Sequence, residues 1–196
     1  MPPRKPHAAL AAIVAALLAI ACLAPVRADF EQGLQAAKRR DFAQAYAHLL
    51  PAAQAGHAQA QLYVANMYRR GYGVERSYAQ AARWYRAAAE QGEPSGMYNY
   101  AVHLREGLGV ARDEDAATAW FEKGARAGHS ASMLNLGLRY FNGLGAPLDK
   151  VLGYAWVHKA SGKGSVPAIH RRRGLEEELS AEEIKRGRAL ALTLLR

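Results

Sequence analysis

The 196-residue sequence predicts an all-α fold, a right-handed α-α solenoid of paired helices, from two observations. Three blocks of 36 residues follow one another without a gap, at 58–93, 94–129 and 130–165. Within each block, apolar residues recur at helical spacing in both halves. A fixed period of this length is typical of stacked helical repeats, because one repeat alone cannot bury its apolar face. The recurring positions are Gly71, Gly107 and Gly143; Gly73, Gly109 and Gly145; Trp84, Trp120 and Trp156; and Gly92, Gly128 and Gly164.

Each block is expected to form two helices joined by a turn at the paired glycines. Small residues at 65, 101 and 137 are expected to let the first helix of a block lie close against the second. The glycine that ends each block suits the left-handed backbone just past a helix end. The large indoles at 84, 120 and 156 are expected to fill the space between one repeat and the next.

The first block carries the repeated pattern in its most complete form. Its matching residues are Ala58-Gln59-Ala60, Tyr68, Gly71-Tyr72-Gly73-Val74, Ala81, Trp84-Tyr85, Ala88-Ala89 and Gly92. At these residues the sequence resembles the Sel1-like repeat family, relatives of the tetratricopeptide repeats. The resemblance is strong over 58–165 and weak over the flanks. It implies a solenoid that holds an extended peptide or a partner helix on the inner face formed by the first helices of the repeats.

The flanks of the three blocks are expected to cap the solenoid. Residues 29–57 are predicted to be an N-terminal capping repeat of tetratricopeptide type, with a short turn at Arg40-Asp41. Residues 166–196 are predicted to form two capping helices, Pro167–Leu179 and Ala181–Leu195. Ser180 and Glu183 have the spacing of a capping box at the start of the second. Its inner stripe is predicted to be Ile184, Ala191 and Leu195.

Residues 1–28 have the pattern of a signal peptide: a short basic start, then an apolar run of 17 residues from Ala8 to Ala24. Cleavage is predicted after Ala28, which places the protein in the periplasm or outside the cell. A retained transmembrane helix needs about 20 apolar residues, so no transmembrane segment is expected after processing. In the alternative reading, Ala19 to Cys22 loosely resemble a lipobox, and the protein is a lipoprotein anchored through Cys22.

Chemistry-bearing motifs are sparse. Cys22 is the single cysteine, so the rest of the chain contains no disulfide and no thiolate metal site. None of the seven histidines has a metal-ligand spacing, and His57 and His129 are predicted to be surface loop residues because each follows a block-ending glycine. Nucleophile-elbow, phosphate-loop and dinucleotide-binding motifs are absent. The sequence therefore predicts no enzyme, no cofactor and no metal.

The formal net charge of +9 raises nucleic acid as a partner, and Arg171-Arg172-Arg173 is the densest basic cluster. Glu176-Glu177-Glu178 follows on the same predicted helix, where pairing at i, i+4 is expected to compensate the arginines. No nucleic-acid partner is therefore expected. Contact with an anionic lipid or polysaccharide remains open.

The candidate partner-binding surface consists of three positions, the sixth, ninth and twelfth, on the first helix of each block. The side-chain amides are expected to hold a peptide backbone, the arginines to face a carboxylate, and the apolar residues to contact apolar side chains. This chemistry predicts a groove that prefers acidic or C-terminal segments. The candidate residues are Tyr63, Asn66, Arg69, Asn99, Arg105, Asn135, Leu138 and Phe141.

From these features the sequence predicts an exported protein-interaction scaffold or adaptor. Its partner is expected to be another protein or peptide of the bacterial envelope, which the family resemblance suggests. The alternative is a cell-wall or anionic glycan or lipid binding protein of the envelope, which would use the positive charge. A third class, a hydrolase, is disfavoured by the missing motifs.

Overall fold

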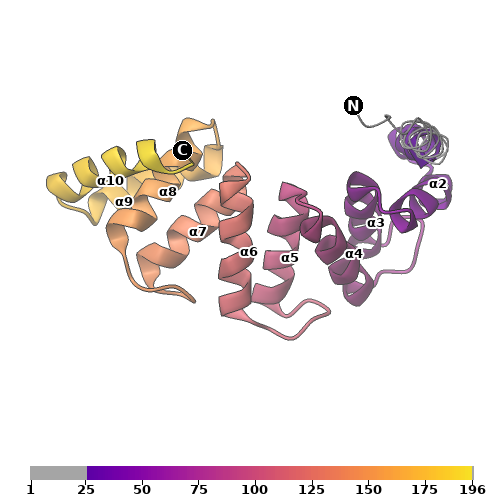
Figure 1. Cartoon of the computed structure of the whole chain (residues 1–196), viewed down its shortest axis with the longest axis horizontal. Helices are drawn as coiled ribbons and strands as arrows, with labels where there is room; N and C mark the ends of the chain where they lie inside the picture. Colours follow the sequence, from indigo (N-terminus) through magenta and orange to yellow (C-terminus); the bar gives the residue numbers. More distant parts are fainter. Residues whose placement is uncertain (1–25, 196) are drawn as a thin grey trace, which may run out of the picture. The chain divides into compact units, whose positions relative to one another are not determined.

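The computed structural model describes residues 26–195, and this part of the chain is all-helical. It confirms the predicted fold class: the described residues form ten helices in helix-turn-helix pairs (Figure 1). The predicted signal peptide, with Cys22, lies outside the described residues except for its last three positions. The first helix spans 26–38, and the others are α2 (Phe42–Gln54), α3 (Ala58–Arg70), α4 (Tyr78–Glu90), α5 (Pro94–Glu106), α6 (Glu114–Arg126), α7 (Ser130–Asn142), α8 (Lys150–Gly162), α9 (Val166–Glu177) and α10 (Ala181–Thr193).

The helices keep the period found in the sequence. The first helix of each block begins at Ala58, Pro94 or Ser130, and the second begins at Tyr78, Glu114 or Lys150. All six are 13 residues long. No described helix is long and apolar enough to cross a membrane.

The turns between paired helices need glycine for two separate reasons. Gly107 ends α5 in the left-handed conformation, with φ 66°. Gly109, two residues on, also has a positive φ, and its α-carbon lies against the backbone of Tyr78 at the start of α4. A Cβ at Gly109 would be 2.5 Å from the Tyr78 carbonyl oxygen, so the turn requires both the unusual backbone angle and the missing side chain.

The described residues divide into two compact units, one ending at Arg76 and one beginning at Ser77. The first unit consists of the first helix, α2 and α3. Gly33 allows the first helix to approach Leu49 of α2, and Leu49 and Val64 are buried in its core. The hydroxyls of Tyr46 and Tyr68 join α2 to α3 at 2.7 Å, and burial together with this hydrogen bond raises the pKa of Tyr46 to about 12.

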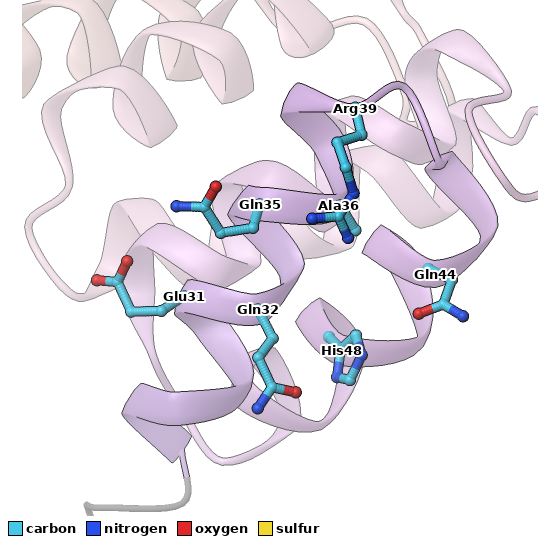
Figure 2. A pocket seen from close by; sticks show the side chains of 7 residues that line it. All are labelled: Glu31, Gln32, Gln35, Ala36, Arg39, Gln44 and His48. Atoms are coloured by element: carbon cyan, nitrogen blue, oxygen red, sulfur yellow. The ribbon is translucent and has the colours of Figure 1, made fainter.

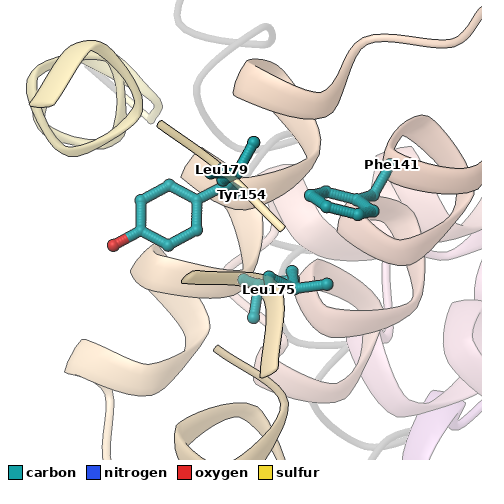
Figure 3. Close-up of a cluster of buried hydrophobic side chains, with 5 residues drawn as sticks. Phe141, Tyr154, Leu175 and Leu179 are labelled. Carbon is teal, nitrogen blue, oxygen red and sulfur yellow. The ribbon is translucent and has the colours of Figure 1, made fainter. Parts of the chain in front are cut away.

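The second unit contains α4 to α10. Consecutive helices from α4 to α8 pack against one another, and α8 also contacts α9 and α10. Helices α7, α8 and α9 and the turn after α9 form a hydrophobic cluster (Figure 3). Its buried members are Phe141, Tyr154, Val157, Leu175 and Leu179. This cluster joins the last repeat to the C-terminal helices.

The tryptophans do not occupy the equivalent interior positions that the sequence predicts. Trp84 and Trp120 are half-buried, and only Trp156 is buried. The residue after each tryptophan, Tyr85, Phe121 or Val157, is fully buried, as are several alanines of the same helices. The face of each second helix that points to the interior is therefore centred near the residue after the tryptophan, and the indole lies at the edge of that face. Trp156 differs because it lies on α8, which α9 and α10 both contact.

The C-terminal helices match the prediction with one error. The capping box of Ser180 and Glu183 is present at the start of α10, and Ala191 is buried. Leu195, predicted to face inward, is 39% exposed because α10 ends at Thr193. Of the predicted charge compensation within α9, one i, i+4 pair is present, Arg172 with Glu176 at 3.7 Å.

His57 and His129 are helix N-caps, which corrects the prediction that they are surface loop residues. Each imidazole is half-buried and accepts a backbone N–H bond at Nδ1, from Ala60 at 3.2 Å and from Ser132 at 3.3 Å. The polar cap explains why histidine recurs at this repeat position: it satisfies an N–H group that the first turn of a helix leaves unpaired.

We expect acid to weaken the cap at His129. Burial holds the pKa of His129 below its ordinary value of 6.5, with Glu93 opposing the shift, and protonation of Nδ1 would abolish its acceptor role. The native state therefore binds fewer protons than the unfolded state, so stability is complete above about pH 6.5 and falls as the pH drops through the lowered pKa. In urea unfolding, the free energy of unfolding should be lower at about pH 5 than at about pH 7.5. In His129→Asn this loss should be smaller by about 0.5–2 kcal/mol, because asparagine caps the helix without titrating. An unchanged acid loss in the variant would refute this role.

Candidate functional site

Two of the predicted partner-binding residues line a groove in the first unit. Tyr63 is 41% exposed and Asn66 is half-buried, both on α3. The groove has a volume of about 350 Å³ and lies over the first helix, α2 and α3. Its lining is Ala37, Phe42, Leu49, Tyr63, Asn66, Met67, Arg70 and Tyr72. The cation in the lining is Arg70, not the predicted Arg69, whose Nη2 donates instead to Asn66 Oδ1 at 3.4 Å.

The groove combines rigid apolar walls with one charged group. The rings of Phe42 and Tyr72 stack with centroids 4.4 Å apart and planes 13° from parallel. The guanidinium carbon of Arg70 lies 5.8 Å from the Tyr72 ring centroid. Leu49 and Met67 contribute buried apolar surface, so the groove has room for an apolar side chain beside a guanidinium that would face a carboxylate.

Arg105 and Asn135 of the second unit are joined to each other. Arg105 Nη1 donates to Asn135 Oδ1 at 2.8 Å, and its Nε donates to Glu106 at 2.8 Å. The guanidinium carbon also lies 5.9 Å from the ring centroid of Phe121. Arg105 is thus part of the contact between α5 and α7, and a carboxylate ligand would compete with groups that already hold it.

The predicted asparagine amides bond mainly to their own helices. Nδ2 of Asn66, Asn99 and Asn135 each donates to the carbonyl four residues earlier, at 2.9, 2.8 and 2.9 Å. This local bond uses one of the two N–H groups of each amide and fixes the side chain against the helix surface. The asparagines are therefore oriented, but less of their hydrogen-bonding capacity remains for a peptide than the sequence suggests.

Phe141 and Leu138 do not belong to an exposed binding face. Phe141 is only 2% exposed and is a member of the hydrophobic cluster of α7, α8 and α9 (Figure 3). The ammonium of Lys150 lies 5.1 Å from its ring centroid. Leu138 packs against the same cluster. The prediction failed for Phe141 because the C-terminal helices cover this part of α7, and nothing in the 36-residue period indicates that cover.

A second hollow in the first unit is polar (Figure 2). It has a volume of about 320 Å³ and lies between the first helix and α2. The first helix contributes Glu31, Gln32, Gln35, Ala36 and Arg39, and α2 contributes Gln44 and His48. Ala36 is the one apolar residue of this lining, so the hollow does not offer the apolar walls of the groove.

The buried charges of the second unit are structural. Arg139 is 5% exposed, and its Nη2 donates to the Glu114 carboxylate at 2.7 Å and to the Glu114 carbonyl at 2.8 Å. Hydrogen bonds from Arg112 and Arg139 hold the pKa of Glu114 below its usual range. The ion pair ties α7 to the start of α6. Sequence analysis missed it because Arg139 occupies a position where the other blocks have Met67 and His103.

Within the described residues, no three histidine or acidic side chains are grouped to hold a metal ion. His103 is 1% exposed, and its Nδ1 bonds to the Leu108 carbonyl at 2.7 Å in the turn after α5. His103 thus stabilises a turn.

Helix pairs in constant register, joined by turns that begin with a left-handed glycine, define the class: a helical repeat protein of the tetratricopeptide type. The chain belongs to the Sel1 repeat family, whose model matches residues 28–57, 58–93, 94–129 and 130–165. The first match coincides with the segment predicted as the N-terminal capping repeat. Sel1 repeats generally form protein-interaction scaffolds and are typically not enzymes.

Two of the solved structures that are similar to this chain illustrate the fold. One is c5321, a protective antigen of uropathogenic Escherichia coli strains with an SLR fold, at 32% identity and a TM-score of 0.72. The other is a Sel1 repeat protein from Oxalobacter formigenes, at 25% identity and a TM-score of 0.69. The matches cover 78% and 73% of this chain but only 32% and 59% of those proteins. No curated protein matches the chain.

Proposed function

We propose that the chain is a scaffold that binds a segment of a partner protein in the groove formed by the first helix, α2 and α3. The observation that carries this proposal is the lining of that groove, where Tyr63 and Asn66 meet the stacked rings of Phe42 and Tyr72. Exposed aromatic side chains over a concave apolar surface provide large contact areas at small entropic cost, as in other peptide-binding sites. Arg70 favours a segment that carries a carboxylate.

The proposal includes export. The apolar run at Ala8 to Ala24 and the small residues before Asp29 support a signal peptide at 1–28, with lipidation of Cys22 as the alternative. The partner is then a protein of the bacterial envelope. The intact mass of the protein recovered from cells tests this part separately: a chain that begins at Asp29 supports soluble export, and a diacylglycerol adduct on Cys22 supports anchoring.

The groove is tested by site-specific photo-cross-linking in intact source cells. A benzophenone side chain in place of Tyr63 should give one dominant adduct with an envelope protein. Arg70→Glu should reduce this adduct by about tenfold, since it removes a favourable charge contact and adds a repulsive one. The matched control is Lys38→Glu, an equal change in net charge on an exposed residue outside the groove lining, which should leave the adduct unchanged.

The same cross-linker at Arg86, exposed on α4, serves as the positional control. Equal adducts from positions 63 and 86, or an adduct at Tyr63 that Arg70→Glu does not reduce, would contradict a binding role for the groove. Circular dichroism of each variant should show unchanged helicity, because Arg70 and Lys38 are both exposed.

A further inference from the structure

A further concave site lies in the second unit between α8 and α10, which pack against each other. The cleft has a volume of about 280 Å³ and is lined by His158, Lys159, Gly162, Lys163, Ala191 and Leu192. Leu192 is 68% exposed although it forms part of this wall. The side chain of Leu192 therefore offers apolar surface that the described residues leave largely uncovered.

The rim of the cleft is basic and contains no acidic side chain. Lys159 Nζ donates to the Ala191 carbonyl at 3.1 Å, which holds the ammonium over the cleft. Lys163 lies one turn further along, with its ammonium beside the backbone of Gly128. Among the described residues, neither lysine forms a salt bridge with a carboxylate. Two like charges at i, i+4 also repel each other, so each would gain from a carboxylate supplied by a partner.

The acidic residue behind the cleft does not compensate these charges. Glu176 accepts hydrogen bonds from Tyr154 at 2.6 Å and from Arg188 at 3.1 Å, and it pairs with Arg172 at 3.7 Å. Burial, then Arg172 and Arg188, hold the pKa of His158 below its ordinary value, and Glu176 opposes them.

We propose that this cleft binds an acidic segment of a partner protein, with one leucine-sized side chain against Ala191 and Leu192 and neighbouring carboxylates on Lys159 and Lys163. The charge complementarity is direct, and a cleft of about 280 Å³ has room for one inserted side chain. A flat anionic membrane would not fill a concave site. This second site is independent of the groove in the first unit.

The test uses two blocked pentapeptides, acetyl-GDLEG-amide and acetyl-GNLQG-amide, which have nearly the same shape but differ in charge. With the isotope-labelled full chain, the acidic peptide should shift the amide resonances of Gly162, Lys163 and Leu192 and raise the pKa of His158. The neutral peptide should do neither. Lys163→Glu should weaken binding of the acidic peptide by about threefold to tenfold, since it replaces an attractive charge by a repulsive one.

The matched control is Lys185→Glu, the same charge reversal on an exposed residue of α10 outside the cleft, which should leave binding unchanged. Because Lys159 also ties α8 to α10, Leu192→Ser is the second variant; its side chain is exposed, so the fold should survive while binding weakens. Equal effects of the two peptides, or of Lys163→Glu and Lys185→Glu, would overturn the proposal. So would retention on phosphatidylglycerol vesicles that depends on Lys163 without any peptide binding.

Discussion

Replacing Phe121 by alanine is expected to destabilise the second unit by about 3–5 kcal/mol, the largest effect of any single truncation considered for this chain. Phe121 is fully buried on α6. The guanidinium carbons of Arg105 and Arg139 lie 5.9 and 6.0 Å from its ring centroid, and the Tyr98 ring lies 6.0 Å away. The substitution thus leaves a cavity at a site where α5, α6 and α7 meet.

The informative control is the neighbouring residue. Trp120 is larger than Phe121 but half-buried, and its contacts are an edge-on pair with Tyr100 at 5.5 Å and the Lys123 ammonium at 4.0 Å. Trp120→Ala should therefore cost less, about 1–2 kcal/mol. Urea unfolding followed by circular dichroism measures both variants. If Trp120→Ala proves more damaging than Phe121→Ala, the indoles and not the residues after them form the interior of the repeats.

The second large effect is expected from adding one methyl group at Gly153. A Cβ there would be 2.6 Å from the Gly137 carbonyl oxygen and 2.6 Å from the Phe141 nitrogen. Both are backbone atoms, which cannot turn aside as a flexible side chain does. Gly153→Ala should therefore force α7 and α8 apart and destabilise the second unit by about 3 kcal/mol.

Gly174 provides a matched control of opposite sign. It lies inside α9, and no atom outside its own stretch of helix stands within 4 Å of where its Cβ would be. Gly174→Ala should stabilise the chain by about 0.5–1 kcal/mol, because alanine has the higher helix propensity. Thermal and urea unfolding compare the two variants. Equal shifts for both substitutions would show that propensity, and not the α7–α8 contact, governs position 153.

The recurring glycines explain why the ends of the helices could be predicted from the sequence. The block-ending glycines Gly92, Gly128 and Gly164 all have positive φ, as their recurrence in the sequence predicts. Backbone angles and helix caps are determined by residues a few positions apart, so a repeated pattern specifies them. The capping box at Ser180 was correctly predicted for the same reason.

The candidate site was predictable only in part. Tyr63 and Asn66 were expected to face a partner from their place on α3, and both line the groove. Three other lining residues were not predicted. Arg70 lies next to a predicted position on α3, Phe42 lies on α2, and Tyr72 lies in the turn after α3. A period in the sequence tells which residues share a helix face, but it does not tell which side chains from separate elements surround one hollow.

By itself the sequence determined the all-α class, the helix pairs and the glycine turns between them, because each depends on short-range spacing that a 36-residue period repeats. Tertiary structure decided which members of each repeat are interior. It buried Phe141 beneath the C-terminal helices, shifted the core from Trp120 to Phe121, and placed Arg139 on Glu114. The physical reason is that burial depends on what packs against a surface, and that neighbour is set by elements distant in the chain.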